Sequence, residues 1–133
     1  MFNIERYNIV KEIKGIFNKG YLTGSYELGC INYNDIDILI MRDNLPNIDY
    51  SNKYEEKSQY SHSLFKNSYD FKFIYKGVVV NVIVFDEEVA MFNVIRTTNI
   101  LKEYVQQYDI DIENKQVRVT LFEYILRQNL KYS

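Results

Sequence analysis

The chain has 133 residues, enough for one hydrophobic core but too few for two ordinary domains, so we expect residues 1–133 to form a single domain. A formal net charge of -2 gives no broad basic field that would recruit nucleic acid. Cys30 is the only cysteine, which excludes an internal disulfide, a cysteine-based zinc site and a CxxC redox pair, and is typical of a reducing compartment.

Hydropathy gives no sign of export. No stretch approaches the roughly 18 uninterrupted apolar residues of a membrane-spanning helix, and charges are scattered through residues 1–15 instead of forming a signal peptide. We therefore expect a cytoplasmic protein without a membrane partner. The 13 tyrosines offer faces on which nucleobases stack, but their scatter along the chain is explained better by half-buried positions in helices and strands.

The first third of the chain alternates between helical and strand patterns. Residues 3–18 are predicted to form an amphipathic helix that stops at 18–20. Its apolar positions recur at helical spacing: Tyr7, Val10, Ile13 and Phe17. We expect a short strand at 21–23, a turn of helix at 26–32, and a clean strand at 35–41 in which isoleucines alternate with other residues.

The middle of the chain contains a polar segment and a hairpin. Residues 42–69 are predicted to be loop, with a short surface helix at 54–60. The apolar runs 71–75 and 78–85 flank a Lys-Gly turn, which indicates a tight β-hairpin. Alternating helices and strands of this size predict an α+β fold with helices packed on a small mixed or antiparallel sheet.

Two helices are expected in the last third. Asp86, Glu87 and Glu88 suit an N-cap and a first helical turn, where carboxylates are favourable against the helix dipole, and we expect this helix to reach about Tyr104. A final helix is predicted over 115–130. Its expected buried residues are Val117, Leu121, Phe122, Ile125 and Leu126.

Two aspartates open the strand at 35–41. Side chains two residues apart point to the same face of a strand, about 6.5 to 7 Å apart at the backbone, so Asp35 and Asp37 are predicted to be neighbours. Two ionised carboxylates at one place repel each other unless a cation or water lies between them. Hard oxygen donors suit Mg²⁺ or Mn²⁺, and Mg²⁺ commonly joins protein carboxylates to substrate phosphates.

A Gly-Ser turn precedes the aspartates. Gly24 permits close approach of the backbone to a ligand, Ser25 adds a hydroxyl, and the following helical turn offers free N–H groups to an anion. Taken alone, a D-x-D pair is most often a solvent-facing strand edge, and a lone G-S carries little information. In this order, strand, G-S, turn and then D-x-D, they form a far more specific pattern.

These residues resemble the nucleotidyltransferase superfamily with the DNA polymerase β-like fold. Its signature, h-G-[GS] followed by [DE]-h-[DE]-h, is matched by Leu22-Thr23-Gly24-Ser25 and, nine residues later, by Asp35-Ile36-Asp37-Ile38. The motif covers about 20 residues, and the order of later elements extends the likeness weakly to about residue 105. In its small size the chain is similar to the minimal nucleotidyltransferases of bacteria and phages. Separately, its many Asn, Ile, Lys, Tyr and Phe residues have AT-rich codons, which indicates a low-GC bacterium or one of its phages as the source.

The resemblance implies transfer of a nucleoside monophosphate from an NTP, with ATP expected, to a hydroxyl on protein or RNA. It assigns Gly24 and Ser25 to the phosphates and Asp35 and Asp37 to Mg²⁺ or Mn²⁺. Three basic residues are further candidates for phosphate contacts: Lys72, Lys76 and Arg42. The lone histidine, His62, lies in a polar stretch and is expected to be an exposed loop residue more than a base.

One position departs from the family pattern. The family places a third carboxylate on a later strand, where this chain has only Asn81 as a polar residue. Asp86 cannot replace it, because five residues on it faces the other side of the strand. We expect Asn81 to face the site, where it would orient the acceptor, although a hydrogen-bonded structural amide is also compatible. Beside an active enzyme, the departure leaves two alternatives: a catalytically degenerate nucleotidyltransferase-like binding protein with a phage–host or antitoxin-like role, or a metal-free interaction domain.

Overall fold

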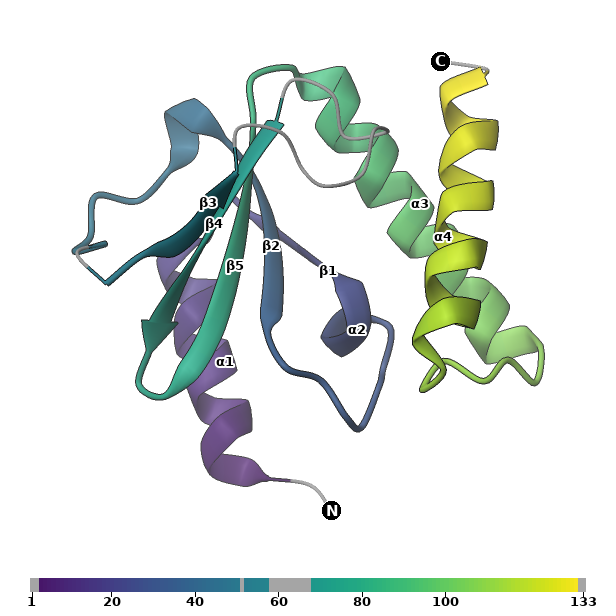
Figure 1. The fold of residues 1–133 in the computed structure, drawn as a ribbon, viewed down its shortest axis with the longest axis horizontal. Coiled ribbons are helices and arrows are strands. Elements are labelled where there is room, and N and C mark those ends of the chain that lie inside the picture. The colour runs from purple at the N-terminus through teal and green to yellow at the C-terminus, as the bar shows by residue number, and fades with distance from the viewer. Residues whose placement is uncertain (1–2, 51, 58–67, 132–133) are drawn as a thin grey trace.

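The computed structural model describes residues 3–50, 52–57 and 68–131 and has an α+β architecture (Figure 1). Its elements are α1 (Ile4–Ile16), β1 (Tyr21–Thr23), α2 (Gly24–Glu27), β2 (Ile36–Met41), the 3-10 helix η1 (Arg42–Asn44), β3 (Tyr54–Lys57), β4 (Ser68–Tyr75), β5 (Val78–Phe85), α3 (Glu88–Gln107) and α4 (Lys115–Lys131). The strands form one mixed sheet in the order β1-β2-β5-β4-β3. Only β2 and β5 pair in parallel among them. The predicted fold class, helices on a small mixed sheet, is confirmed.

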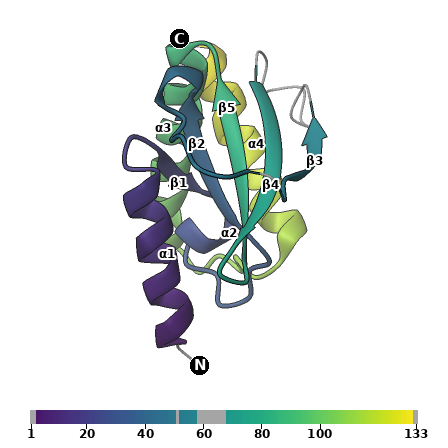
Figure 2. The ribbon, with the colours of Figure 1, turned by 90° about the vertical axis from the view of Figure 1, so that its left-hand side faces the viewer.

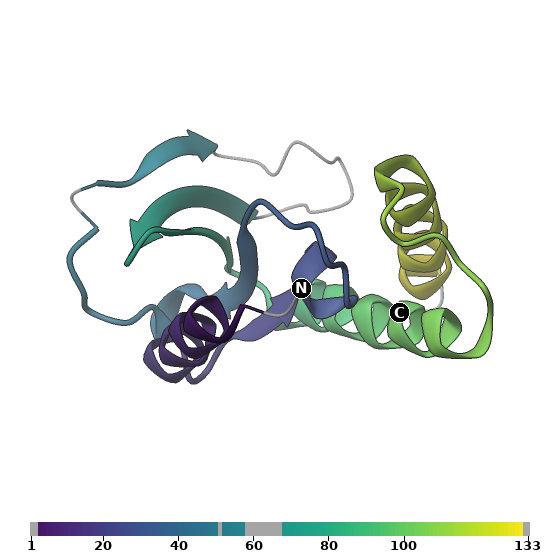
Figure 3. The ribbon, with the colours of Figure 1, turned by 90° about the horizontal axis from the view of Figure 1, so that it is seen from below.

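The two faces of the sheet are covered by different helices. One face carries the isoleucines of β2 at positions 36, 38 and 40 and packs against Val10, Ile13 and Phe17, which belong to α1 and its C-terminal end. The opposite face packs against Met91 and Val94 of α3. Figure 3, seen from below, shows α1 on one side of β1 and β2 and α3 on the other, and Figure 2 shows α1 running along the edge of the sheet. Strand alternation thus separates an apolar face from the face that carries the aspartates.

The hairpin between β4 and β5 has the predicted two-residue turn. Lys76 and Gly77 both have positive φ, 49° and 80°, as a type I′ turn requires. This turn matches the twist of the flanking strands, so eight residues of each strand pair in register from Ser68↔Phe85 to Tyr75↔Val78. The hairpin prediction is confirmed.

Two local predictions are wrong. Residues 54–57 form β3, an edge strand antiparallel to β4, where a surface helix was expected; β4 offers an open edge there, and tertiary pairing overrides the weak helical pattern. The helical turn α2 occupies 24–27 instead of 26–32, because Gly24 and Gly29, with φ of 78° and 94°, bound it on either side. His62 lies outside the described residues.

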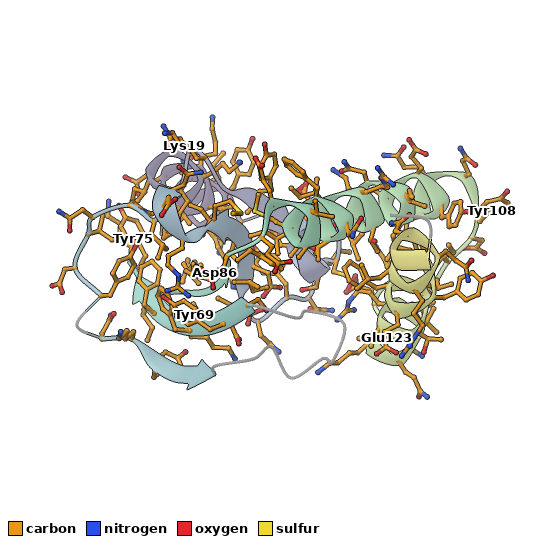
Figure 4. All side chains as sticks on the ribbon, turned by 90° about the horizontal axis from the view of Figure 1, so that it is seen from above. Lys19, Tyr69, Tyr75, Asp86, Tyr108 and Glu123 are labelled. Atoms are coloured by element: carbon orange, nitrogen blue, oxygen red, sulfur yellow. The ribbon has the colours of Figure 1, made fainter. Side chains whose placement is uncertain are left out.

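Asp86 does not cap α3. The N-cap residue is Glu87, without a side-chain cap hydrogen bond, and Asp86 instead accepts two hydrogen bonds from Arg42, at 2.6 and 3.1 Å. The strand register explains this ion pair. Met41 and Phe85 pair across the parallel strands β2 and β5, so Arg42 and Asp86, which follow them, lie at the same end of the sheet. Arg42 also lies over the ring of Tyr69, at 4.8 Å, and Figure 4 shows Asp86 above this end of the sheet.

Helices α3 and α4 pack against each other beside the sheet. α3 continues to Gln107, three residues beyond the expected end. In α4, Ile125 and Leu126 are buried as predicted, whereas the other three residues expected in the core are only partly buried. No helix in the described part of the chain combines the length and the apolar character needed to cross a membrane.

A pair of buried threonines joins β1 to α3. The Thr98 hydroxyl donates to the Val94 carbonyl at 2.9 Å, so the 2.7 Å contact between the two threonine hydroxyls is a hydrogen bond from Thr23 to Thr98. Thr23 and Thr98 are 5% and 2% exposed. Thr23 immediately precedes Gly24, so this bond anchors the Gly-Ser turn to the helix behind it.

Replacing Thr98 by valine is expected to lower the free energy of unfolding by about 1 to 3 kcal/mol, because the Thr23 hydroxyl then stays buried without an acceptor. Denaturant titration measures the change. The double variant Thr23→Val/Thr98→Val should recover part of the loss, since it removes both polar partners. A double variant less stable than the sum of the two single changes would contradict this account of the pair.

Candidate functional site

A line of polar residues crosses the sheet on the face that α3 covers in part. The strand register pairs Thr23 with Asp37, Asp37 with Asn81, and Asn81 with Lys72. Directly paired residues point to the same face, so four neighbouring strands contribute one side chain each. The aspartate motif therefore lies in the interior of the sheet, with strands on both sides, and not at an exposed edge.

Asn81 holds the second aspartate of the motif. Its Nδ2 donates to Asp37 Oδ1 at 3.0 Å, while its own Oδ1 is buried without a hydrogen-bond partner among the described residues. The residue is only 4% exposed. A buried carbonyl oxygen without a partner costs about 1 to 3 kcal/mol, so the structure places Asn81 against the aspartates with one unused acceptor.

The first aspartate lies just before β2 and is paired with a lysine. Asp35 Oδ2 is 3.8 Å from Lys72 Nζ, and the two side chains are 23% and 29% exposed. Lys72 belongs to β4, so its side chain spans β5 to approach Asp35. This contact places a positive charge beside Asp35. Of the three basic candidates, Lys72 is the one that lies beside the aspartates.

The carboxyl of Asp37 is an unusually weak acid. Burial and, after it, the charge of Asp35 raise its pKa from 3.8 to about 7. The hydrogen bond from Asn81 and the charge of Lys72 act against these effects without cancelling them. Repulsion between the two carboxylates thus contributes to the raised pKa of Asp37, as expected from their spacing, and a divalent cation bound between them would favour its ionised form.

The main chain of Gly24 lies directly against the Asp37 carboxylate. Its φ is 78°, and a Cβ at this position would overlap Asp37 Oδ2. Only glycine allows the turn to pass so close to the aspartate, which brings the main chain of Gly24 beside the Asp37 carboxylate, and Ser25 follows it as the next residue of α2. The two halves of the sequence motif, eleven positions apart at Gly24 and Asp35, are thus brought together by the pairing of β1 with β2.

The loop between α2 and β2 is fixed by the C-terminal part of the chain. Glu113 accepts hydrogen bonds from the backbone N–H groups of Ile31 and Asn32, at 2.9 and 3.0 Å, and these bonds lower the pKa of its carboxyl. Lys102 of α3 donates to Glu27 of α2 at 3.0 Å. Contacts with residues 75 to 82 positions away therefore set the path of the segment that carries the motif.

Asp70 is a residue that the sequence reasoning missed. It lies on β4, is 4% exposed, and sits two residues from Lys72, so it points to the same face of the sheet. Its charge contributes to raising the pKa of Asp37. The D-x-K pattern at 70–72 alternates as D-x-D does, but only the strand order β2-β5-β4 brings it near the aspartates.

The other basic candidates lie elsewhere. Lys76 is in the hairpin turn and donates to both carboxylate oxygens of Glu12 at 3.0 and 3.1 Å. Arg42 is engaged with Asp86 beyond the far ends of β2 and β5. The structure brings neither to Gly24 or the aspartates.

The donor set can be tested against a divalent cation. Two carboxylates and an unused amide oxygen are hard ligands of the kind that Mg²⁺ and Mn²⁺ prefer. Among the described residues, no three His, Cys, Asp or Glu side chains gather closely enough to hold a metal by themselves. The residues present therefore fit a cation that takes its remaining ligands from water and from a substrate, and do not fit a closed structural metal site.

Comparisons with known proteins give no match. Neither the scan of protein-family models nor the searches of curated proteins and of solved structures found one.

Proposed function

We propose that the chain is a metal-dependent nucleotidyltransferase with a polymerase β-like fold, which transfers NMP from an NTP to a hydroxyl of a protein or RNA acceptor. The observation that carries the proposal is the contact of Gly24 with the Asp37 carboxylate. It joins an approachable main-chain turn to a pair of repelling carboxylates, which is what a phosphate group and its metal counter-ion require on adjacent surfaces.

The roles follow from the position of each group. Asp35 and Asp37 would hold Mg²⁺ or Mn²⁺, which when bound neutralises the phosphate charge that develops during transfer. The main chain at Gly24 and the hydroxyl of Ser25 would bind the terminal phosphates. Asn81 donates to Asp37 through Nδ2, and its unpartnered Oδ1 would bind the cation or orient the acceptor. Catalysis would come mainly from positioning and charge neutralisation.

One observation favours a second function. The position opposite Asp37 on β5 is an amide, which carries no charge and is a very poor base. Asp70 lies on the next strand but does not complete a metal-binding group with the other two carboxylates. A catalytically degenerate protein that binds a nucleotide and a protein partner therefore remains the competing proposal, and it keeps the phosphate and metal roles while losing transfer.

Both proposals predict linkage between nucleotide and metal. ATP with Mg²⁺ at about 100 times its Kd is expected to stabilise the protein by about 2.7 kcal/mol, measured as a rise in melting temperature. ATP with EDTA should give little of this rise, and Asp35→Asn/Asp37→Asn should abolish it. The exposed aspartate variant Asp109→Asn is a matched control that should behave as the wild type. Equal stabilisation in EDTA would contradict the metal role.

A further inference from the structure

A cavity of about 640 Å³ lies between the start of α1 and the loop that precedes β2. Its described lining residues are Asn3, Arg6, Tyr7, Tyr26, Gly29, Cys30, Ile31 and Tyr33. The volume is within the range of small-molecule sites, about 300 to 1,000 Å³. The aspartates and Gly24 are not among these residues, so the cavity is distinct from the candidate metal site.

Aromatic rings and one guanidinium dominate its lining. The Arg6 guanidinium lies over the Tyr33 ring at 4.2 Å from its centroid, and Tyr33 meets Tyr26 edge to face at 5.0 Å with an interplanar angle of 72°. Arg6 is the only charged residue among the described lining residues. Tyrosine faces and guanidinium planes are the surfaces on which unstacked nucleobases stack.

Arg6 also has an unused donor. Its Nε is buried without a hydrogen-bond partner among the described residues. Arginine has five N–H donors and no acceptor, so a ligand in the cavity that carries acceptor atoms would supply a kind of partner that this side chain lacks. A planar ligand that stacks on tyrosine and carries acceptor atoms on its edge meets both requirements.

We propose that the Arg6–Tyr26–Tyr33 cavity binds the purine base of a nucleoside or nucleotide. A purine offers a larger stacking face than a pyrimidine, and guanine presents O6 and N7 side by side, the pair of acceptors that arginine recognises best. The cavity takes guanosine in preference to adenosine, and either in preference to cytidine. Phosphate and metal are not needed for this binding.

The test uses the absence of tryptophan from the chain. In Tyr33→Trp the introduced indole is the only one in the protein and keeps an aromatic face in the cavity. Guanosine is titrated in EDTA while the indole fluorescence is recorded, and saturation-transfer NMR is run in parallel with the wild-type protein. Saturable quenching and transfer to the purine protons are expected, with weaker binding of cytidine.

The controls separate the cavity from other binding. Tyr108→Trp, at an exposed position at the end of α3 (Figure 4), should not respond. Arg6→Gln in the Tyr33→Trp background should weaken guanosine binding by about tenfold or more, whereas Arg42→Gln should leave it unchanged. Asp35→Asn/Asp37→Asn should also leave it unchanged, which makes the result independent of the proposed nucleotidyl transfer. Absence of saturation by both methods, equal binding of cytidine, or loss in the aspartate variant would overturn the proposal.

Discussion

Asp37→Asn is expected to stabilise the metal-free protein strongly at pH 8. In the folded chain the pKa of Asp37 is raised from 3.8 to about 7, because the carboxyl is buried beside Asp35. A tenfold change in proton affinity corresponds to about 1.4 kcal/mol, so ionisation of Asp37 costs the folded state at most about 4 kcal/mol. Asparagine removes this cost and keeps an oxygen that can accept the hydrogen bond from Asn81.

The sign of the pH dependence follows from the raised pKa. Below about pH 4 both folded and unfolded wild type hold the proton, and the variant should have no electrostatic advantage. Between about pH 4 and pH 7 the unfolded chain has lost the proton and the folded chain still holds it, so wild-type stability falls as the pH rises and the advantage of the variant grows until it levels off above pH 7. Urea titrations in EDTA at pH 5 and pH 8 measure it.

Magnesium should reduce this stability difference between the variant and the wild type. A cation bound by Asp35 and Asp37 stabilises the wild type but not Asp37→Asn, so the difference between them should shrink in excess Mg²⁺. Asp109→Asn, at an exposed position, serves as the control: it keeps Asp37, so its stability should follow that of the wild type at both pH values. If Asp37→Asn is less stable than the wild type in EDTA at pH 8, the ionised Asp37 carboxylate stabilises the fold, which contradicts the cost of ionisation argued above.

Gly24→Ala should damage both stability and ligand binding. The φ of 78° costs a residue with a Cβ about 1 to 2 kcal/mol. The Cβ would also overlap Asp37 Oδ2, so either the turn or the carboxylate must move. We expect a total loss of about 2 to 4 kcal/mol in the free energy of unfolding, together with loss of the melting-temperature rise given by ATP and Mg²⁺.

Gly77→Ala separates the two effects. Gly77 has nearly the same φ, 80°, but a Cβ there meets no atom within 4 Å. The control should therefore lose stability through backbone strain alone and keep the response to ATP and Mg²⁺. If both variants keep the response, the close contact between Gly24 and Asp37 has no part in binding.

Strong local patterns were predictable from the sequence. The isoleucine alternation of β2 follows from the two-residue period of a strand, and the Lys-Gly hairpin turn follows from the positive φ that glycine permits. Both features depend only on residues that are neighbours in the sequence. Gly24 and Asp37 could be named from their spacing. The contact between Gly24 and Asp37 could not be predicted from this spacing, because it results from the antiparallel pairing of β1 with β2.

The errors share a physical cause. Strand β3 exists because β4 offers an open edge, and Asp86 is drawn to Arg42 because parallel strands end side by side. Both depend on partners remote in sequence. Asp70 was overlooked for the same reason, since its place beside the aspartates follows from the strand order β2-β5-β4, which no local pattern contains.

Transfer of label from α-³²P NTPs is the most direct test of the proposed function. Each NTP is incubated separately with Mg²⁺ or Mn²⁺ and with the RNA and protein fractions of a bacterial lysate, using wild type, Asp35→Asn/Asp37→Asn and Asp109→Asn. The account predicts label in one fraction with the wild type and Asp109→Asn, and none with the double variant. Absence of label with a folded wild type that binds ATP and Mg²⁺ would contradict catalysis and leave the degenerate binding protein as the function.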